Sequence, residues 1–427
     1  MGRRVPSGGS KVQGGGNRKL GLLMPPMIPA RGPIWTTWPH CPIDHGGAAR
    51  VPSQTMSTAD FLSDLRWRGL LHQATHEDAL AQHLATGRRT AYVGFDPTAD
   101  SLTIGNLVPL LMLARFQRAG HRPIAVVGGG TGLIGDPSGK SAERQLLTPD
   151  DVARNVAGQR RIFERLLDFD GAKQGGGALL VDNLEWLGSP SFIAALRDVG
   201  KHFSVNMMIQ RDSVRERLHN REQGISYTEF SYMLLQAYDF LHLHKEHGVT
   251  LQMGGSDQWG NIVAGCDLIR RSLTDPERQV FALTTPLITK ADGGKFGKTE
   301  RGAVWLTADR TSPYAFYQFW LNSDDRDVER FLKTFTFLPQ DEITALLAEH
   351  ARDPGARAPH RALARHVTEL LHGAAERDQA EAAARALFSG ELRGLSASLL
   401  DEVLAAAPST SAARDRLAGA SEAPSTS

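Results

Sequence analysis

The sequence predicts an α/β fold in which helices cover both faces of a parallel sheet, followed by a region of helices alone. Apolar β-branched runs alternate with amphipathic segments up to about residue 306, and only helical apolar spacing continues beyond it. The 427 residues suffice for two or three domains with full cores. We therefore expect folded domains over residues 59–306 and 307–407.

The two ends of the chain differ from the middle in composition. Residues 1–58 are rich in Gly, Pro and Arg and contain no acidic residue before Asp44, while residues 408–427 are rich in Ala, Ser and Thr. Both segments are predicted to be disordered. A transit peptide would share the basic bias of the leader, but its glycines and prolines prevent the amphipathic helix of such a peptide.

Composition excludes several protein classes. With 48 basic and 47 acidic side chains, the chain has no overall attraction for nucleic acid, so any RNA contact must come from a local patch. Cys41 and Cys266 are the only cysteines, which excludes a disulfide framework and an all-cysteine zinc site. No apolar stretch approaches the ~20 residues that span a bilayer. A cytoplasmic protein without membrane insertion is expected.

Four strands of a sheet of about five can be located, and each is followed by a helix. The strands are predicted at 90–95, 122–129, 177–183 and 249–255, and the helices at 106–120, 149–168, 191–199, 228–244 and 257–271. Beyond residue 307, helices are predicted at 312–322, 327–338, 341–350, 361–373 and 380–390. Five aromatic residues between Tyr314 and Trp320 could stack bases, but their helical spacing favours a core role.

Polar residues gather where the predicted parallel strands end. Asp96 and Thr98, Asp136, Asn183 and the segment 256–258 all occupy such positions. Ligands of parallel sheets bind beyond the carboxyl ends of the strands. The sequence thus places a ligand site at this edge of the sheet.

Two short motifs indicate what that ligand is. GFDPTADSLTIGN at 94–106 joins a strand end to a helix start, where backbone donors can face phosphate oxygens. KFGKT at 295–299 puts two lysines around a glycine, on a segment able to close over phosphates. The ordered pair indicates a nucleotide site that activates a carboxylate.

Three other motifs resemble known binding signatures, but none of them fits its signature fully. GTGLIG at 130–135 fits a dinucleotide fingerprint, but Pro137 and Gly139 follow where its helix should run. GDPSGKS at 135–141 is one residue short of a P-loop. HLHKEH at 242–247 contains three histidines, but the first two cannot share a helix face, so no metal site is predicted.

A polar stripe marks the helix predicted over 228–244. Tyr232, Gln236 and Asp239 share one face of an otherwise apolar helix. An exposed helix face is the alternative, but the apolar neighbours favour a substrate pocket.

Taken in order along the chain, the motifs resemble those of bacterial-type tyrosyl-tRNA synthetases, from about Ser57 to about Pro408. They are Tyr92 with GFDPTADSLTIGN, then GGGTGLIGDPSGK, VDNLEWLG, FSYMLLQAYDF, LQMGGSDQWGN and KFGKTE. The resemblance implies the Rossmann-like parallel sheet of class I synthetases followed by an all-helical, tRNA-facing domain. The RNA-binding domain usual at this family's C-terminus has no counterpart after about residue 408.

The resemblance also implies residue roles. Tyr92 and Asp239 would hydrogen-bond the phenolic hydroxyl of tyrosine, the group by which this family is known to reject phenylalanine. The α-ammonium would be held by Asp136, Tyr232 and Gln236, and Asn183 and Gln258 would complete the pocket. ATP would contact Asp96, Gly105, Gly255, Asp257, Leu287, Ile288 and Lys298. The catalytic groups facing the phosphates would be Thr98, Thr103, Asn106, Lys140, Arg144, Lys295, Lys298 and Thr299.

The implied activity is that of a tyrosine–tRNA ligase. L-Tyrosine and ATP, the latter with Mg²⁺ as a substrate complex, would give tyrosyl-adenylate, and tRNA(Tyr) would accept the tyrosyl group. No tightly bound cofactor or resident metal is implied, and the family resemblance implies a homodimer. The alternatives are a tryptophan enzyme, which Tyr92 and Asp239 disfavour, and an adenylate-forming paralogue or RNA-binding protein that does not charge tRNA.

The first signature departs from the family pattern. Thr103 and Asn106 stand where histidines are usual in this family. We expect activity to be retained, with an altered contact to the transition state.

Overall fold

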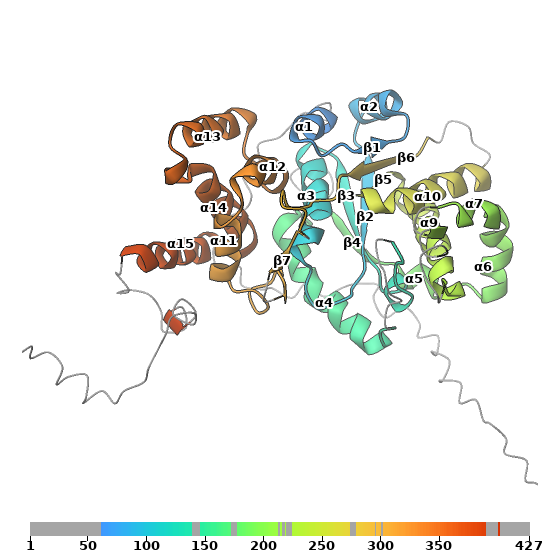
Figure 1. The fold of residues 1–427 in the computed structure, drawn as a ribbon. Helices are drawn as coiled ribbons and strands as arrows, with labels where there is room; N and C mark the ends of the chain where they lie inside the picture. The colour runs from blue at the N-terminus through green and yellow to red at the C-terminus, as the bar shows by residue number, and fades with distance from the viewer. Residues whose placement is uncertain are drawn as a thin grey trace, which may run out of the picture. The chain divides into compact units, whose positions relative to one another are not determined.

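A six-stranded sheet forms the centre of the fold (Figure 1). The computed structural model describes residues 61–138, 146–171, 177–211, 214–215, 218, 224–273, 279–294, 296–299, 302–389 and 400–401. The strands are β1 (Gln73–Ala74), β2 (Thr90–Phe95), β3 (Arg122–Val127), β4 (Leu179–Asp182), β5 (Val249–Gly255) and β6 (Phe281–Thr285). A separate ribbon pairs β7 (Lys298–Thr299) with β8 (Gly302–Ala303). The predicted leader and tail lie outside the described residues.

The sheet runs in the order β1-β6-β5-β2-β3-β4, and only β1 is antiparallel to its neighbour. The predicted strands 90–95 and 249–255 are confirmed residue for residue, while β3 and β4 end earlier than predicted. β3 stops at Val127 because the glycines after it turn the chain out of the sheet. The sequence did not locate β6 or the two-residue β1. The α/β class and the parallel sheet are confirmed.

Helices follow the strands as predicted. Those of the sheet region are α1 (Phe61–Arg68), α2 (Glu77–Ala85), α3 (Ile104–Arg118), α4 (Pro149–Leu166), α5 (Leu184–Leu187), α6 (Phe192–Asp198), α7 (Val205–Ile209), α9 (Tyr227–His247) and α10 (Trp259–Ser272). Short 3₁₀ turns lie at Thr131–Leu133, Gly200–His202, Ser256–Gln258 and Pro354–Ala356.

Helices cover both faces of the sheet. Alternate residues of a strand point to opposite faces, so two residues of β2 contact helices on opposite sides. Tyr92 of β2 packs in one cluster with Phe240 of α9 and Leu268 of α10. Phe95, three residues further along β2, meets Phe163 of α4 edge to face with ring centroids 5.0 Å apart. A side chain at Gly265 would clash with Phe240, so α9 and α10 can approach closely only with glycine there.

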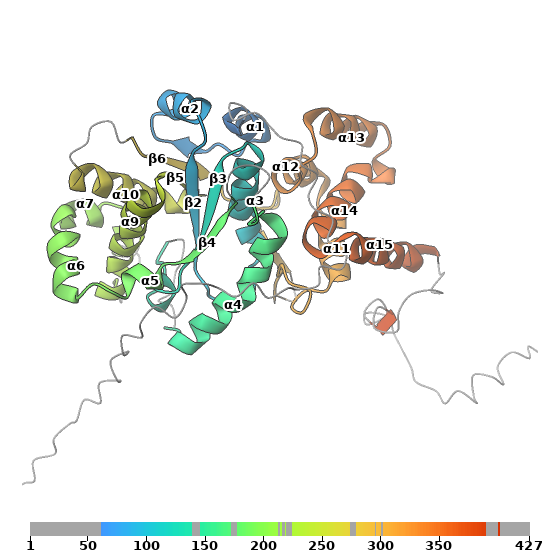
Figure 2. The ribbon, with the colours of Figure 1, turned by 180° about the vertical axis from the view of Figure 1, so that it is seen from behind.

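A group of helices follows the sheet region: α11 (Pro313–Leu321), α12 (Asp325–Phe335), α13 (Gln340–Arg352), α14 (Ala358–His372) and α15 (Ala374–Ser389). Figures 1 and 2 show them on one side of the sheet, with α6, α7, α9 and α10 on the other. Phe316, Tyr317 and Trp320 are buried, which confirms the core reading of this aromatic run. All described residues belong to one compact unit, and the domain boundary at residue 306 stays a prediction.

Among the described residues, no helix has both the length and the apolar character needed to cross a membrane.

Candidate active site

Four parallel strands bring polar residues to one edge of the sheet. Asp96 follows β2, Asn183 follows β4, and Asp257 follows β5. Three glycines follow β3. Two of them connect to the end of β4, since the N–H of Gly129 donates to Asp182 and that of Gly130 to Asn183. The predicted ligand edge is thus assembled in the fold.

Asp96 is the first junction of a hydrogen-bond network at this edge. The hydroxyl of Tyr232 on α9 donates to one carboxylate oxygen at 3.0 Å, and the hydroxyl of Thr131 donates to the other at 2.8 Å. Asn183 Nδ2 donates to that Thr131 hydroxyl at 3.0 Å. Burial raises the pKa of the Tyr232 hydroxyl well above its usual value, and the nearby charges of Asp96 and Asp136 add to the effect.

Asp239 is the second junction. Its two oxygens accept from Asn183 Nδ2 at 2.9 Å and from Trp186 Nε1 at 2.7 Å, and the residue is 4% exposed. Burial raises the pKa of this carboxyl to about 8, although both hydrogen bonds favour the charged form. Trp186 is itself held by a stacked contact with the ring of His242, at a centroid separation of 4.4 Å.

Tyr92 contributes a hydroxyl that has no hydrogen-bond partner within the described part of the chain, although the residue is only 1% exposed. Its ring lies edge to face on Phe240 at 5.5 Å. Burial raises the pKa of this hydroxyl, and the neighbouring Asp239 charge raises it further. Gln236 Oε1 is also buried without a partner among described residues. Unpaired buried polar atoms are costly, so this pair indicates a place where a ligand completes the bonding.

Asp136 forms a separate polar group with the segment after β5. Gln258 Nε2 donates to one of its oxygens at 2.7 Å, and the backbone N–H of Ser138 donates to the other at 2.9 Å. Asn261 Nδ2 lies 3.3 Å from Gln258 Oε1 and holds that amide in place. Asp136 therefore offers a fixed carboxylate close to Tyr232.

The side of the site formed after β5 and β6 is open to solvent. An added Cβ at Gly255 would lie 2.5 Å from Asp257 Oδ1 and 3.4 Å from Leu287 Cδ2. Asp257 is exposed, Leu287 is 58% exposed and Ile288 is half-buried. An exposed leucine beside a glycine and a carboxylate provides an apolar face with a hydrogen-bond acceptor at its edge.

The two signature motifs meet in space although almost two hundred residues separate them. Gly297 has φ +76° and lies so close to Ile104 that a side chain could not be accommodated. Val304 bridges the two segments, since its N–H donates to Gly297 O and its carbonyl accepts from the Ile104 N–H, both at 2.9 Å. Lys298 beside them is exposed. A loop carrying a cation therefore lies at the N-terminus of α3.

The unusual residues of the first signature bond to each other. Asn106 Oδ1 accepts from the backbone N–H of Thr103 at 3.1 Å and from its hydroxyl at 2.9 Å. The amide nitrogen is thus the end of Asn106 that can donate to a phosphate. Gly105 and Thr98 are exposed nearby.

Some predicted positions cannot be placed. Lys140, Arg144 and Lys295 lie outside the described residues, and Thr299 is described only as part of β7. Asp96, predicted to contact ATP, accepts from the hydroxyl of Tyr232, which was predicted to contact the amino acid, so Asp96 lies between the two predicted groups and its role stays a prediction.

The sequence analysis missed Thr131, Trp186 and Asn261 as site residues. Thr131 joins Asp96 to Asn183, and Trp186 donates to Asp239. Trp186 lies three residues after Asn183, which places both on one side of a helical turn, and this spacing was the available signal.

The structure places two of the disfavoured motifs; HLHKEH lies at the end of α9, where His244 is buried rather than exposed to solvent as expected, and part of GDPSGKS lies outside the described residues. Only a three-residue 3₁₀ turn follows Gly130, so no dinucleotide-binding helix begins there. His244 Nδ1 contacts Val249 O at 2.8 Å, and His242 stacks on Trp186.

Residues 84–389 match the family model for class I tRNA synthetases of tryptophan and tyrosine (W and Y). The chain belongs to this family. It is 54% identical over 350 residues to the tyrosine–tRNA ligase of Bacillus caldotenax, covering 82% of each chain. It is also 54% identical over 360 residues to that of Opitutus terrae, covering 84% of this chain and 83% of the other.

Solved structures agree with this assignment. The C-terminally truncated mitochondrial tyrosyl-tRNA synthetase of Aspergillus nidulans superposes with a TM-score of 0.69 at 32% identity, covering 77% of this chain and 94% of that one. The tyrosyl-tRNA synthetase of Archaeoglobus fulgidus, solved with L-tyrosine, shares the fold with a TM-score of 0.54 at 17% identity, covering 74% of this chain and 99% of that one.

Proposed function

We propose that this protein is a tyrosine–tRNA ligase, which activates L-tyrosine with ATP and transfers the tyrosyl group to tRNA(Tyr). The observation that carries the proposal is the buried, unpaired hydroxyl of Tyr92 beside the buried carboxyl of Asp239. The phenolic hydroxyl of tyrosine is both a donor and an acceptor, so it satisfies both groups. Phenylalanine would leave the Tyr92 hydroxyl unpaired and give Asp239 no further donor, and the indole of tryptophan offers no hydroxyl there.

The α-ammonium of tyrosine binds between Asp96, Asp136 and Tyr232. An ammonium has three donors and no acceptor, and this part of the site supplies two carboxylates. Gln236, with its buried unpaired carbonyl oxygen, accepts the remaining donor. Gln258 holds the Asp136 carboxylate in place, and Asn183 acts on Asp96 through the Thr131 hydroxyl.

ATP binds on the open side of the site. Leu287 and Ile288 cover the adenine, Gly255 leaves room for it, and Asp257 accepts from the ribose hydroxyls. The phosphates, carried with Mg²⁺ as the substrate complex, lie at the N-terminus of α3 near Thr98, Gly105 and Asn106. Cationic groups of the second signature and of the 140–144 segment neutralise the leaving group: Lys140, Arg144, Lys295 and Lys298, with Thr299 beside them.

The reaction is a phosphoryl-centre displacement without a protein nucleophile. A tyrosine carboxylate oxygen attacks the α-phosphorus, the bond from that phosphorus to the bridging oxygen breaks, and pyrophosphate leaves. A ribose hydroxyl of the tRNA then attacks the tyrosyl carbonyl and releases AMP. The protein contributes positioning and charge stabilisation.

We further propose a homodimer in the cytoplasm. The helices α6 and α7 carry apolar side chains that face solvent, with Phe192 66%, Ile193 71% and Val205 57% exposed. Such a patch supports a protein interface rather than a free surface. Light scattering of the wild type and of the Ile193→Asp variant tests this, since the charge should produce monomers.

The activity is tested with two assays on the full chain. Tyrosine-dependent ATP–pyrophosphate exchange and tyrosine transfer to tRNA are measured, with phenylalanine and tryptophan as control substrates. Both reactions are expected with tyrosine alone. Exchange without transfer would support the paralogue that does not charge tRNA, and the absence of exchange would contradict both enzyme functions.

A further inference from the structure

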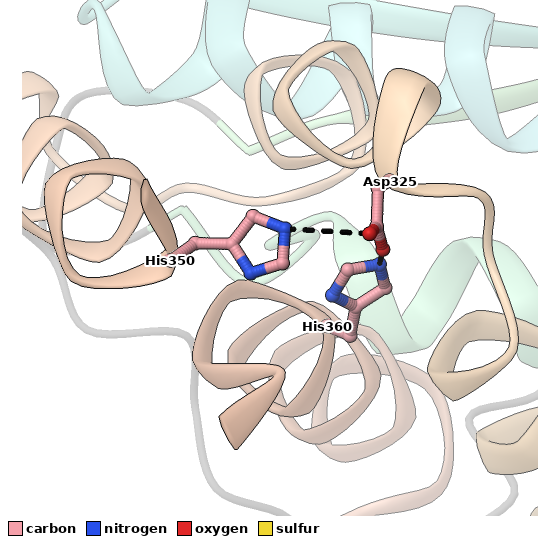
Figure 3. A group of neighbouring side chains, drawn as sticks. All are labelled: Asp325, His350 and His360. Atoms are coloured by element: carbon pink, nitrogen blue, oxygen red, sulfur yellow. Dashed lines mark ion pairs between the residues drawn. The ribbon is translucent and has the colours of Figure 1, made fainter. Parts of the chain in front are cut away.

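Three side chains from three different helices converge far along the chain from the nucleotide motifs. Asp325 is the first residue of α12, His350 lies in the last turn of α13, and His360 lies in the first turn of α14. Figure 3 shows both imidazole rings turned toward the Asp325 carboxylate. Sequence separation hides this group, because no two of its members lie within nine residues of each other.

The distances suit a shared cation. His360 Nε2 lies 3.1 Å from Asp325 Oδ1, and His350 Nε2 lies 3.7 Å from Asp325 Oδ2. One ligand atom from each residue falls within 4.8 Å of the other two. Ligand atoms around a tetrahedral Zn²⁺ with bonds of about 2.0–2.1 Å are separated by roughly 3.3 Å. A small adjustment of His350 would therefore bring all three atoms to one ion.

Burial supplies a second observation. His360 is fully buried, and neither ring nitrogen makes a well-aligned hydrogen bond within the described residues, although a weaker contact with the Ser323 backbone acts on the ring. The carboxylate oxygen 3.1 Å from Nε2 thus lies off the direction in which that nitrogen would donate. A buried imidazole beside a carboxylate, without a well-aligned hydrogen bond between them, leaves a nitrogen lone pair available to a shared cation. Burial also favours the neutral imidazole, which is the form that binds metals.

Asp325 remains accessible. It is half-exposed and lines an open surface hollow with Asn322, Ser323 and Arg357. An ion could enter through this hollow, and a water molecule could take a fourth position. The positive charge of Arg357 opposes binding, since its Nη1 lies 3.3 Å from Asp325 Oδ1. Its other nitrogen is held by the carbonyls of Leu321 and Ser323, so it is anchored independently of the carboxylate.

We propose that Asp325, His350 and His360 form a binding site for a divalent transition metal ion of the Zn²⁺ type, which links α12, α13 and α14. Two imidazoles and one carboxylate suit Zn²⁺ better than Mg²⁺, which prefers oxygen ligands. The sequence gave no indication of this site because its three members lie far apart along the chain. The site is separate from the ATP-binding residues, so its existence does not depend on the proposed function.

The test uses the metal-free full chain titrated with Zn²⁺ in the absence of nucleotide. We expect one Zn²⁺ per chain, and the Asp325→Asn and His350→Ala variants should each bind at least about tenfold more weakly. Both residues are less buried than His360, so the variants should keep their fold, which thermal unfolding without metal verifies. Asp341→Asn, at an exposed first-turn position of α13, and His72→Ala, at an exposed histidine, are the matched controls.

Two further measurements sharpen the result. Zn²⁺ should raise the Tm of the wild type and of both controls but not that of the two site variants, because only a bound ion links the helices. Arg357→Asn should strengthen Zn²⁺ binding by removing the opposing charge, and asparagine tolerates the left-handed backbone at this position, where φ is +48°. No Zn²⁺ binding, or binding of equal strength in the site variants and the controls, would overturn the proposal.

Discussion

The two halves of the active site differ in burial and in how far they are assembled without a ligand. On the proposed tyrosine side, Tyr92, Asn183 and Asp239 are at most 4% exposed; hydrogen bonds fix Asn183 and Asp239, and packing against Phe240 holds the ring of Tyr92. On the ATP side, Asp257 and Lys298 are exposed. Under the proposed function, the difference teaches that the half that distinguishes tyrosine from phenylalanine is built in advance, while the half that holds phosphates relies on charges at the surface. Discrimination requires buried groups that cannot turn to water.

The largest expected effect comes from Asp239→Asn. An asparagine amide cannot accept from both Asn183 and Trp186 while also accepting from the substrate, so one donor stays unpaired. We expect kcat/KM for tyrosine in pyrophosphate exchange to fall by about 100-fold or more. Asp267→Asn, a surface acid paired with Arg270, is the control. Unchanged preference for tyrosine over phenylalanine in Asp239→Asn would mean that this side of the site does not discriminate.

Lys298→Ala tests the exposed half. Under the proposed function the charge of Lys298 stabilises the leaving pyrophosphate, so kcat for exchange should fall by roughly 10²-fold while KM for tyrosine changes little. Lys298→Arg should recover part of the loss because the charge is retained. If KM for tyrosine also rose, the buried and exposed halves of the site would be coupled rather than independent.

The buried half should also make stability depend on pH. Burial raises the pKa of Asp239 from 3.8 to about 8 in the folded protein. The folded chain therefore keeps a proton that the unfolded chain releases, and this stabilisation is complete below about pH 4, declines between about pH 4 and 8, and is absent above that range. The free energy of unfolding should fall by up to about 1.4 kcal/mol per pH unit within the window. Urea unfolding at about pH 6 and 8 measures the free energy of unfolding of the ligand-free wild type and of Asp239→Asn. If this free energy changed equally with pH in both proteins, the pH dependence would not come from Asp239.

The smallest expected effect comes from Thr103→His, which restores the residue usual in the family. The native hydroxyl donates to Asn106, so the replacement breaks that bond while adding a ring that can reach a phosphate. We expect adenylate formation to change by less than about tenfold, or ~1.4 kcal/mol. Single-turnover formation of the adenylate measures this step. A much larger increase would identify Thr103 as a defect of the exposed half.

Local patterns predicted the regular elements well. The β-branched runs at 90–95 and 249–255 gave strands with correct ends, and the spacing in 361–373 gave α14. The sequence missed β6, although its FALTT segment is fully buried, because a strand of five residues leaves little periodicity to detect. β1 has two residues and exists only through its pairing with β6.

The sequence predicted those members of the candidate site that a motif identifies by residue type and position alone. Tyr92, Asp136, Asn183, Tyr232 and Asp239 all lie at the edge or on the helix face where the motifs placed them. Thr131 and Trp186 escaped because their role depends on partners more than fifty residues away. The bond between Asp96 and Tyr232 was not predicted, because it crosses 136 positions of sequence.

The sequence by itself determined the α/β class, the order of the main elements and the residues that face the ligand edge, because these follow from local periodicity and from motifs read in order. Only the tertiary structure decided which of those residues bond to one another, that Thr103 and Asn106 form a pair, and that Asp325, His350 and His360 meet. These contacts could not be predicted because the packing of the whole core, and not the spacing along the chain, sets the distance between such atoms.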